Sequence, residues 1–161
     1  MTGKHKAMGI TPTFKPADIK RRFDAFLKVV EKRQIERLQY LGEQCVKVAR
    51  EIPVESGFTD QTGNLRSSIG YMVFVNGVAV HEGYEVVKGG TEGAQEGAAL
   101  ARKIGTKYAN GISLVVTAGM SYAVAVESRG KDVLTSAEIY AKQELPKMLK
   151  ELKDNINKSL I

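Results

Sequence analysis

Residues 60–80 read DQTGNLRSSIGYMVFVNGVAV, and the rest of the predicted fold is arranged around this stretch. It begins with a turn, because Asp60 or Thr62 can cap a short helix with a side-chain oxygen. Leu65 and Ile69 are four residues apart and therefore fall on one face of that helical turn. The stretch thus enters its first strand through a short capped helix.

A β-hairpin is predicted after this turn. Residues Ile69–Val75 are rich in β-branched and aromatic side chains, which favour strands. Asn76-Gly77 is typical of a two-residue type I′ turn, since both positions need positive φ. This turn predicts a returning strand and fixes the register of the pair. The predicted partners are Val75 with Val78, Val73 with Val80, and Tyr71 with Glu82.

Side chains of the hairpin alternate between its two faces. One face is predicted to carry Ile69, Tyr71, Val73, Val75, Val78 and Val80. The other face is predicted to carry Met72, Phe74, Ala79 and His81. Both faces are largely apolar, so both need cover from other elements.

A long amphipathic helix is predicted before the hairpin. It begins near Pro16-Ala-Asp18 and ends before Pro53, because the residue preceding a proline avoids the α region. Its apolar residues recur at spacings of three and four, and a charged interruption between Val30 and Leu38 predicts that the helix bends or projects there. These residues are Ile19, Phe23, Phe26, Leu27, Val30, Leu38, Leu41, Cys45, Val48 and Ile52.

A second amphipathic helix is predicted over residues 133–160. Pro146 lies inside it and is expected to kink or restart the helix. The apolar stripe consists of Leu134, Ala137, Tyr140, Ala141, Leu145, Met148, Leu149, Leu152 and Ile156.

The segment between the hairpin and this last helix is harder to assign. Residues 83–111 are rich in glycine, which is costly to order, and predict a partly mobile insertion with a short helix over Ala98–Ile104. Ile112–Gly119 alternates and predicts a third strand. Ser121–Glu127 predicts a short helical turn, with a fourth strand as the alternative.

Together these elements predict an α+β fold. A small, mostly antiparallel sheet of three or four strands is covered by a long N-terminal helix and a C-terminal helix. Residues 1–15 predict a flexible basic arm. Residues 16–161 predict a single domain with a glycine-rich insertion at about 83–111.

The composition is that of an ordinary globular protein. The chain has 161 residues, of which 43% are hydrophobic and 26% are charged. It has no apolar run of about 18 residues, so we expect no membrane span, and no secretion signal is expected at its start. Cys45 is the only cysteine, which favours a reducing compartment. It lies on the apolar stripe of the first helix and is expected to be a small core residue.

The net charge of +6 is concentrated near the N-terminus. Residues 1–50 hold twelve Lys or Arg against five Asp or Glu. Such an excess is typical of a solvated helix face, and it also fits a surface that faces phosphate or an acidic partner. The candidate contacts with a partner or with DNA are Lys20, Arg21, Arg22, Lys32 and Arg33. No aromatic residue stands within either basic cluster, residues 20–22 or residues 32–33, so these side chains would touch phosphate without reading sequence.

The sequence offers no arrangement of residues typical of catalysis or cofactor binding. His5 and His81 are far apart, and a metal site needs three or four converging ligands. The carboxylates nearest to predicted loops, such as Glu82 and Glu127, have no spacing that forces a catalytic pair. Phosphate-loop and serine-nucleophile motifs are absent. We therefore expect no catalytic residues, no cofactor and no metal.

Two short motifs carry a resemblance to a known family. Residues 62–69, TGNLRSSI, resemble a Thr-Gly-x-Leu-Arg-x-Ser-Ile step into a first strand, and residues 121–127, SYAVAVE, resemble a Tyr-Ala-x-x-x-Glu turn. The two motifs occur in this order between flanking helices, and a Leu-Pro-Lys step follows at residues 145–147. In these features the chain resembles the minor tail component or tail-completion (head–tail connection) proteins of tailed bacteriophages. The matching residues, to which the resemblance gives an architectural role, are Thr62, Gly63, Leu65, Arg66, Ser68, Ile69, Tyr122, Ala123 and Glu127.

The resemblance implies a structural subunit of a phage or prophage neck or tail that catalyses no reaction. It implies a homo-oligomeric ring at the head–tail junction, in contact with neighbouring neck or tail proteins, in a virion assembled in the bacterial host cytoplasm. In that setting Lys20, Arg21 and Arg22 would face packaged DNA or an acidic neighbour. The alternative is a nucleic-acid-binding module that uses the basic N-terminal helix. The chain departs from the family after Glu127, where Ser-Arg-Gly-Lys-Asp replaces a Gly-Thr step, and in the length of residues 83–111.

Overall fold

The computed structural model describes residues 13–53 and 55–160. The predicted arm at residues 1–15 lies outside the described residues except for its last three, and so does His5. The chain divides into two compact units, Met1–Lys32 and Arg33–Ile161. The elements are α1 (Pro16–Arg50), α2 (Asn64–Ser67), β1 (Ile69–Val75), β2 (Val78–Gly83), α3 (Thr91–Gly105), β3 (Ile112–Ala118), α4 (Ala123–Ser128) and α5 (Thr135–Ser159).

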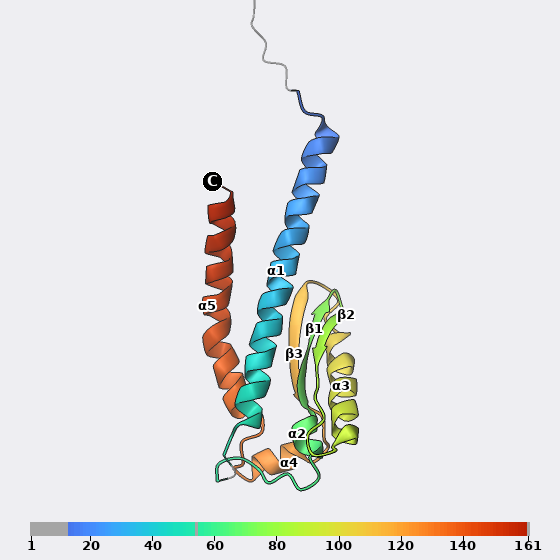
Figure 1. Cartoon of the computed structure of the whole chain (residues 1–161), viewed down its shortest axis with the longest axis vertical. Coiled ribbons are helices and arrows are strands. Elements are labelled where there is room, and N and C mark those ends of the chain that lie inside the picture. Colours follow the sequence, from blue (N-terminus) through green and yellow to red (C-terminus); the bar gives the residue numbers. More distant parts are fainter. Residues whose placement is uncertain (1–12, 54, 161) are drawn as a thin grey trace, which may run out of the picture. The chain divides into compact units, whose positions relative to one another are not determined.

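The second unit confirms the predicted α+β class. Its antiparallel sheet has the strand order β2-β1-β3, and the described residues add no fourth strand because α4 is a helix. Figure 1 shows α5 and the C-terminal half of α1 on one side of the sheet and α3 on the other. α5 also continues through Pro146 as one helix, so the predicted restart does not occur.

Two apolar cores fill the spaces between these layers. The larger lies between the sheet and the α1 and α5 helices, and its buried members include Leu41, Cys45, Ile69, Tyr71 and Val73. The smaller lies between the sheet and α3 and is formed by Met72, Phe74, Ala101 and Val115. Both faces of β1 are therefore buried, as predicted, whereas β2, which was predicted to be covered with it, is mostly exposed.

The predicted hairpin register is correct only at the turn. Val75 pairs with Val78, but Val73 pairs with His81 and Tyr71 with Gly83, because a β-bulge makes Val80 an extra residue in β2. The bulge moves later residues of β2 to the opposite face. His81 consequently lies beside Tyr71, with ring centroids 5.7 Å apart, and not on the face of Phe74 as predicted.

The glycine-rich segment is also different from its prediction. It contains α3, a helix of 15 residues that covers the second face of the sheet, where only a short helix over Ala98–Ile104 was expected. Its glycines allow backbones to approach closely: a Cβ at Gly93 would lie 1.9 Å from the Asn64 carbonyl oxygen, and one at Gly97 would lie 2.3 Å from that of Ser68. Composition gave no sign of this close packing, because a glycine that permits close backbone approach cannot be told in sequence from one that permits mobility.

Candidate functional site

The first motif forms a rigid turn around Asp60. The Asp60 side chain is buried, and its two carboxylate oxygens accept hydrogen bonds from the backbone N–H groups of Gly63 (2.9 Å) and Arg66 (2.8 Å). Thr62 accepts a further bond from the N–H of Asn64, so Asp60 and Thr62 both cap α2. Gly63 itself has φ of 79°, which favours glycine. The turn therefore depends on hydrogen bonds that lie within the chain.

The remaining residues of this motif also serve architecture. Leu65 and Ile69 are buried in the larger core. The Arg66 guanidinium lies 5.0 Å from the centroid of the Phe58 ring, a cation–π contact. Ser68 is fully buried and donates its hydroxyl hydrogen bond to the Leu65 carbonyl at 2.7 Å.

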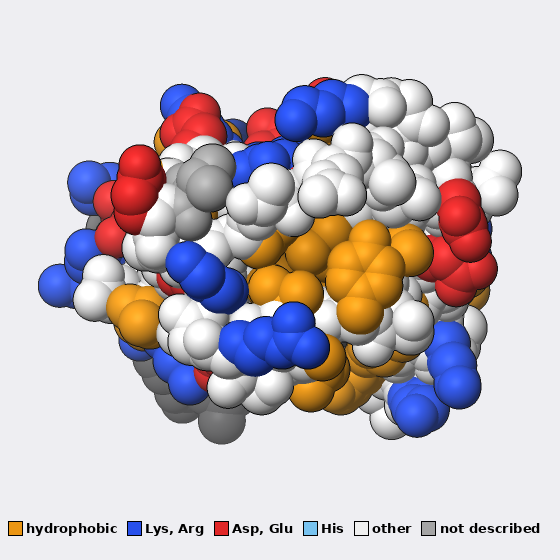
Figure 2. Space-filling model, turned by 90° about the horizontal axis from the view of Figure 1, so that it is seen from below, with side chains coloured by type: hydrophobic (Ala, Val, Ile, Leu, Met, Phe, Trp, Pro, Cys, Tyr) orange, Lys and Arg blue, Asp and Glu red, His pale blue; other side chains and the backbone are white. Residues whose placement is uncertain are grey.

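The second motif meets the first at one end of the sheet. Thr62 is close enough to the Tyr122 hydroxyl to lower its pKa, although burial has the larger effect and raises that pKa, and Ala123 is buried in the same core as Leu65. Figure 2 looks onto this end, where hydrophobic side chains gather with Lys and Arg beside them. Val124 is the most exposed large hydrophobic side chain of the described residues. The two motifs are about 60 residues apart in sequence but pack together at this end of the sheet. We call this contact between residues 62–69 and 121–127 the joint.

Glu127 ends the second motif and holds the start of α5. One of its carboxylate oxygens accepts hydrogen bonds from the backbone N–H groups of Leu134 (3.1 Å) and Thr135 (3.0 Å), and from the Thr135 hydroxyl (2.6 Å). Burial would raise the pKa of Glu127, but these hydrogen bonds outweigh it and hold that pKa below its ordinary value. A carboxylate at a helix N-terminus is also favoured by the helix dipole.

Glu127 should therefore make the stability of the fold depend on pH. Because its pKa is lowered in the folded state, its contribution is present above the ordinary value of 4.5 and is lost as pH falls through the folded pKa. We expect Glu127→Gln to flatten the loss of stability between neutral and acidic pH. Urea unfolding of both proteins across this range measures the effect, and Glu55→Gln, at an exposed residue, is the control. Identical pH profiles for wild type and Glu127→Gln would contradict the assigned role.

A polar chain links α1 to the hairpin, and sequence reasoning missed it. The Tyr71 hydroxyl donates a hydrogen bond to Glu43 (3.2 Å), and His81 Nε2 lies 2.9 Å from the same hydroxyl. Burial, and then the charge of Glu43, raise the pKa of Tyr71. Tyr71 is therefore kept protonated, which makes it a poor base or nucleophile. Only the bulge in β2 brings His81 to this face, so regular alternation gave no signal for the cluster.

The carboxylates near His81 are paired elsewhere. Glu82 forms an ion pair with Arg102 at 2.8 Å, and Glu85 forms one with Arg50 at 3.0 Å. Arg50 also donates to the carbonyl oxygen of Ile69 and so ties the end of α1 to β1. Among residues 13–53 and 55–160 no group of three or more His, Cys, Asp or Glu side chains is placed to hold a metal ion.

The candidate basic contacts all lie on α1 and are exposed or partly paired. Arg21 forms an ion pair with Asp18 at 2.7 Å within the first unit. Lys20, Arg22 and Lys32 are exposed there, and Arg33 is exposed in the second unit. The three consecutive residues 20–22 point in different directions around the helix, because successive residues are about 100° apart.

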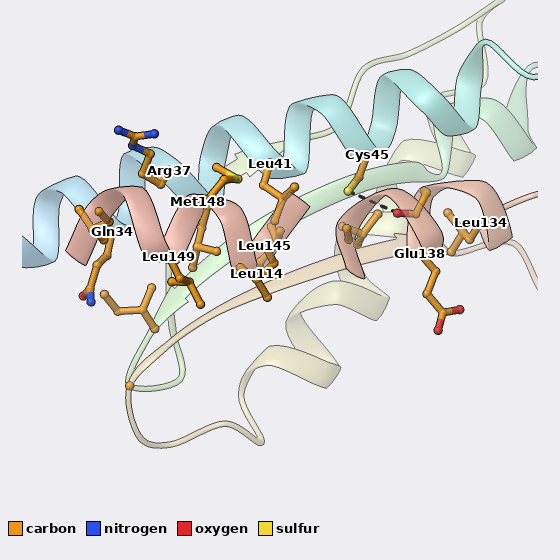
Figure 3. Close-up of a pocket in the computed structure, with 17 residues that line it drawn as sticks. Gln34, Arg37, Leu41, Cys45, Leu114, Leu134, Glu138, Leu145, Met148 and Leu149 are labelled. Atoms are coloured by element: carbon orange, nitrogen blue, oxygen red, sulfur yellow. Dashed lines mark hydrogen bonds between the residues drawn. The ribbon is translucent and has the colours of Figure 1, made fainter. Parts of the chain in front are cut away.

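An apolar groove of about 800 Å³ lies between α1, α5 and β3 in the second unit. Figure 3 shows its side chains converging from the three elements. Polar groups, such as Gln34, Arg37 and Glu138, contribute little to its wall, and Arg37 is already paired with Glu151 at 3.2 Å. The apolar part of the wall includes Leu38, Leu41, Leu114, Leu145, Met148 and Leu149.

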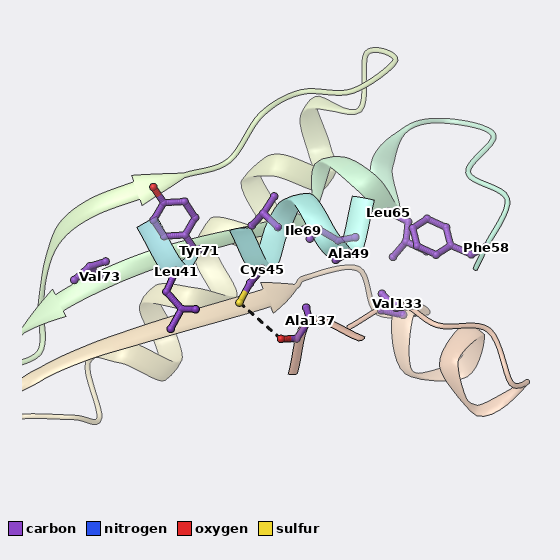
Figure 4. Packing of buried hydrophobic residues seen from close by; sticks show 12 residues of the cluster. Leu41, Cys45, Ala49, Phe58, Leu65, Ile69, Tyr71, Val73, Val133 and Ala137 are labelled. Atoms are coloured by element: carbon purple, nitrogen blue, oxygen red, sulfur yellow. Dashed lines mark hydrogen bonds between the residues drawn. The ribbon is translucent and has the colours of Figure 1, made fainter. Parts of the chain in front are cut away.

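Cys45 lies at the base of this groove, as the stripe of α1 predicted. Its thiol is 1% exposed and donates a hydrogen bond to the carbonyl oxygen of Ala137, 3.7 Å away (Figure 4). Burial raises the pKa of Cys45 to about 11, so little of it is thiolate at neutral pH. The prediction that it is a core residue is confirmed.

We expect the Cys45 thiol to react with a disulfide reagent such as dithionitrobenzoate far more slowly in the folded protein than in urea, by at least a hundredfold. The thiolate is the reactive species, and here it is both scarce and shielded. Absorbance of the released thionitrobenzoate measures both rates. Comparable rates in buffer and in urea would show that the groove exposes the thiol.

Two further observations bear on function. No helix within the described residues has the length and apolarity to traverse a bilayer. Comparisons with protein-family models, with curated proteins and with solved structures give no match to this chain. The structure thus defines an α+β protein whose two motifs build one joint, and whose α1 and α5 helices border an open apolar groove.

Proposed function

We propose that this chain is a structural subunit of a phage or prophage neck or tail. In this proposal it assembles as a homo-oligomeric ring at the head–tail junction, contacts neighbouring neck or tail proteins, and catalyses no reaction. The observation that carries the proposal is the joint between the motifs at residues 62–69 and 121–127. These are the motifs that resemble the tail-completion family, and here their residues serve to hold elements together.

The surfaces of the second unit support an assembly role. β2 and β3 are the outer strands of the sheet, and each has an edge without a partner strand among the described residues. The edge strand β2 exposes Val78 and Val80, which are apolar. Unpaired strand edges with apolar side chains favour contact between chains. The groove between α1 and α5 adds a further apolar surface to these edges.

The proposal is tested by the oligomeric state of the full chain. Sedimentation velocity and electron microscopy should show a ring, alone or after mixing with phage portal, neck and tail-tube proteins. A chain that is strictly monomeric and binds none of these proteins would contradict the proposal.

Nucleic-acid binding is the second candidate, and the charge of the first unit favours it. Residues 13–32 hold six Lys or Arg side chains against three Asp or Glu, and the six basic side chains are exposed. Contacts with phosphate release counterions, so affinity for duplex DNA should fall steeply with salt. A Lys20→Ala, Arg22→Ala double variant should bind more weakly with a shallower salt slope, whereas Lys150→Ala on α5 serves as the control. Absence of binding at low salt removes this candidate.

A further inference from the structure

The first unit exposes an apolar stripe on α1. Ile19, Phe23 and Leu27 follow one another at spacings of four and are 52%, 58% and 47% exposed. Such large side chains on one face of a helix are normally covered. Exposed apolar residues that line up in this way indicate an interaction surface.

The groove of the second unit is suited to receive such a stripe. It is of the size that binds small molecules, about 300–1,000 Å³, but lacks the converging polar groups that orient a small ligand. The Cys45 thiol already donates to Ala137, and Arg37 is paired with Glu151. The free wall is apolar, and Leu149 on α5 is 52% exposed. A groove of this kind matches the mode in which an amphipathic helix places its apolar side chains between helices.

We propose that the α1 stripe of one copy, formed by Ile19, Phe23 and Leu27, docks into the α1–α5–β3 groove of a second copy. The same α1 stripe, further along at Leu41 and Cys45, already lies against α5 within the chain. The proposed contact continues this interface with side chains of the same kind. It rests on the proposed function, because it names the contact by which copies join in a ring.

Charge favours docking into the groove over pairing of two stripes. At about 3.6 residues per turn, Lys20 and Arg22 fall on opposite sides of the stripe. Two stripes facing each other would bring these like charges together. Glu138 on the wall of the groove forms an ion pair with Lys142 at 2.6 Å, and Arg37 on the same wall is paired with Glu151 at 3.2 Å, so the charged residues that line the groove are neutralised and do not repel Lys20 and Arg22. The contact joins two different surfaces and is therefore heterologous, which is the type that generates rings.

The test uses two variants of the full chain, Phe23→Glu on the stripe and Leu149→Glu on the groove. Both residues are more than half exposed, so neither change should unfold the subunit, and circular dichroism checks this. We expect each variant alone to sediment as a monomer under conditions in which wild type is a ring. Mixed one to one, they should form a dimer, because Phe23→Glu supplies an intact groove and Leu149→Glu an intact stripe. Val124→Glu, at an exposed residue of α4, should leave the ring intact.

The outcomes separate this inference from the proposed function. A wild-type chain that is strictly monomeric and binds no neck protein overturns both. A ring that persists in both variants overturns the docking contact and leaves the ring standing. If Leu149→Glu alone still associates while Phe23→Glu does not, the stripes pair with each other and the groove is not involved.

Cross-linking provides a second measurement that does not depend on loss of assembly. Cys45 is the only cysteine and is buried, so new thiols can be introduced without removing it. A mixture of Phe23→Cys and Leu149→Cys chains should give a disulfide-linked dimer on mild oxidation, at a yield at least tenfold above that of either variant alone. An equal yield for Val124→Cys mixed with Phe23→Cys would overturn the assignment.

Discussion

Gly63→Ala is expected to destabilise the fold by about 3 kcal/mol or more. The cost has two sources, the strain of an alanine at positive φ and the steric clash of its Cβ with neighbouring atoms. Gly63 has φ of 79°, and a Cβ there would lie 1.9 Å from the carbonyl oxygen of Val87. That oxygen belongs to the backbone and cannot rotate away. The chain around Val87 is also fixed, because the Ser67 hydroxyl accepts a hydrogen bond from the Val87 N–H at 2.7 Å. Urea unfolding of the full chain measures the change.

Gly89→Ala is the matched control for this prediction. Gly89 has nearly the same φ, 78°, but no atom lies within 4 Å of a Cβ placed there. Its cost should be about 1 kcal/mol, the penalty of the left-handed conformation alone. If the two substitutions cost the same, contact between residue 63 and the backbone of Val87 has no energetic weight, and the turn is less rigid than described.

Phe74→Ala is expected to cost about 4 kcal/mol, since the loss of a buried aromatic ring leaves a cavity. Phe74 is 1% exposed and fills the core between the sheet and α3. Gly105 packs directly against it, because a Cβ there would lie 2.1 Å from the ring. The cavity should loosen α3 in particular. Amide hydrogen exchange measures this. The loss of protection in α3 should exceed the loss that the lower unfolding free energy explains, and it should be larger than the loss in α5.

Phe14→Ala provides the comparison, since Phe14 is 59% exposed and precedes α1. It should change the unfolding free energy by less than about 0.5 kcal/mol, as is usual for surface positions. If Phe74→Ala were equally mild, α3 would not be a structural layer of the domain. The glycine-rich segment would then behave as the mobile insertion that its composition indicates.

Most of the architecture could be predicted from periodicity and turn chemistry. The spacing of Leu41 and Cys45 predicted the buried face of α1, and Asn76-Gly77 predicted the turn, where both residues have positive φ. Alternation placed Leu114 and Val116 on one face of β3, and both line the same groove. These features depend on local sequence, so a window of a few residues is sufficient to reveal them.

The features that were missed depend on distant parts of the chain. α3 is stabilised by backbone approaches at Gly93 and Gly97, whose partners lie in or beside α2. A glycine that permits close packing and one that permits mobility look the same in sequence. The contact of His81 with Tyr71 depends on the bulge, which no local pattern marks. Joining of the two motifs through Tyr122 and Thr62 likewise required the tertiary fold.

The bulge in β2 also has a consequence for how sequences of this kind should be aligned. Val80 is the one residue of the strand without a partner in β1, whereas Val78, Ala79 and His81 each have one. A chain that lacked Val80 could keep every other pair of the hairpin and every side chain on its present face. Gaps between homologous sequences are therefore expected to fall at this position. A gap placed one residue to either side would remove a paired residue, so an alignment programme that ignores the bulge would mismatch Ala79 or His81.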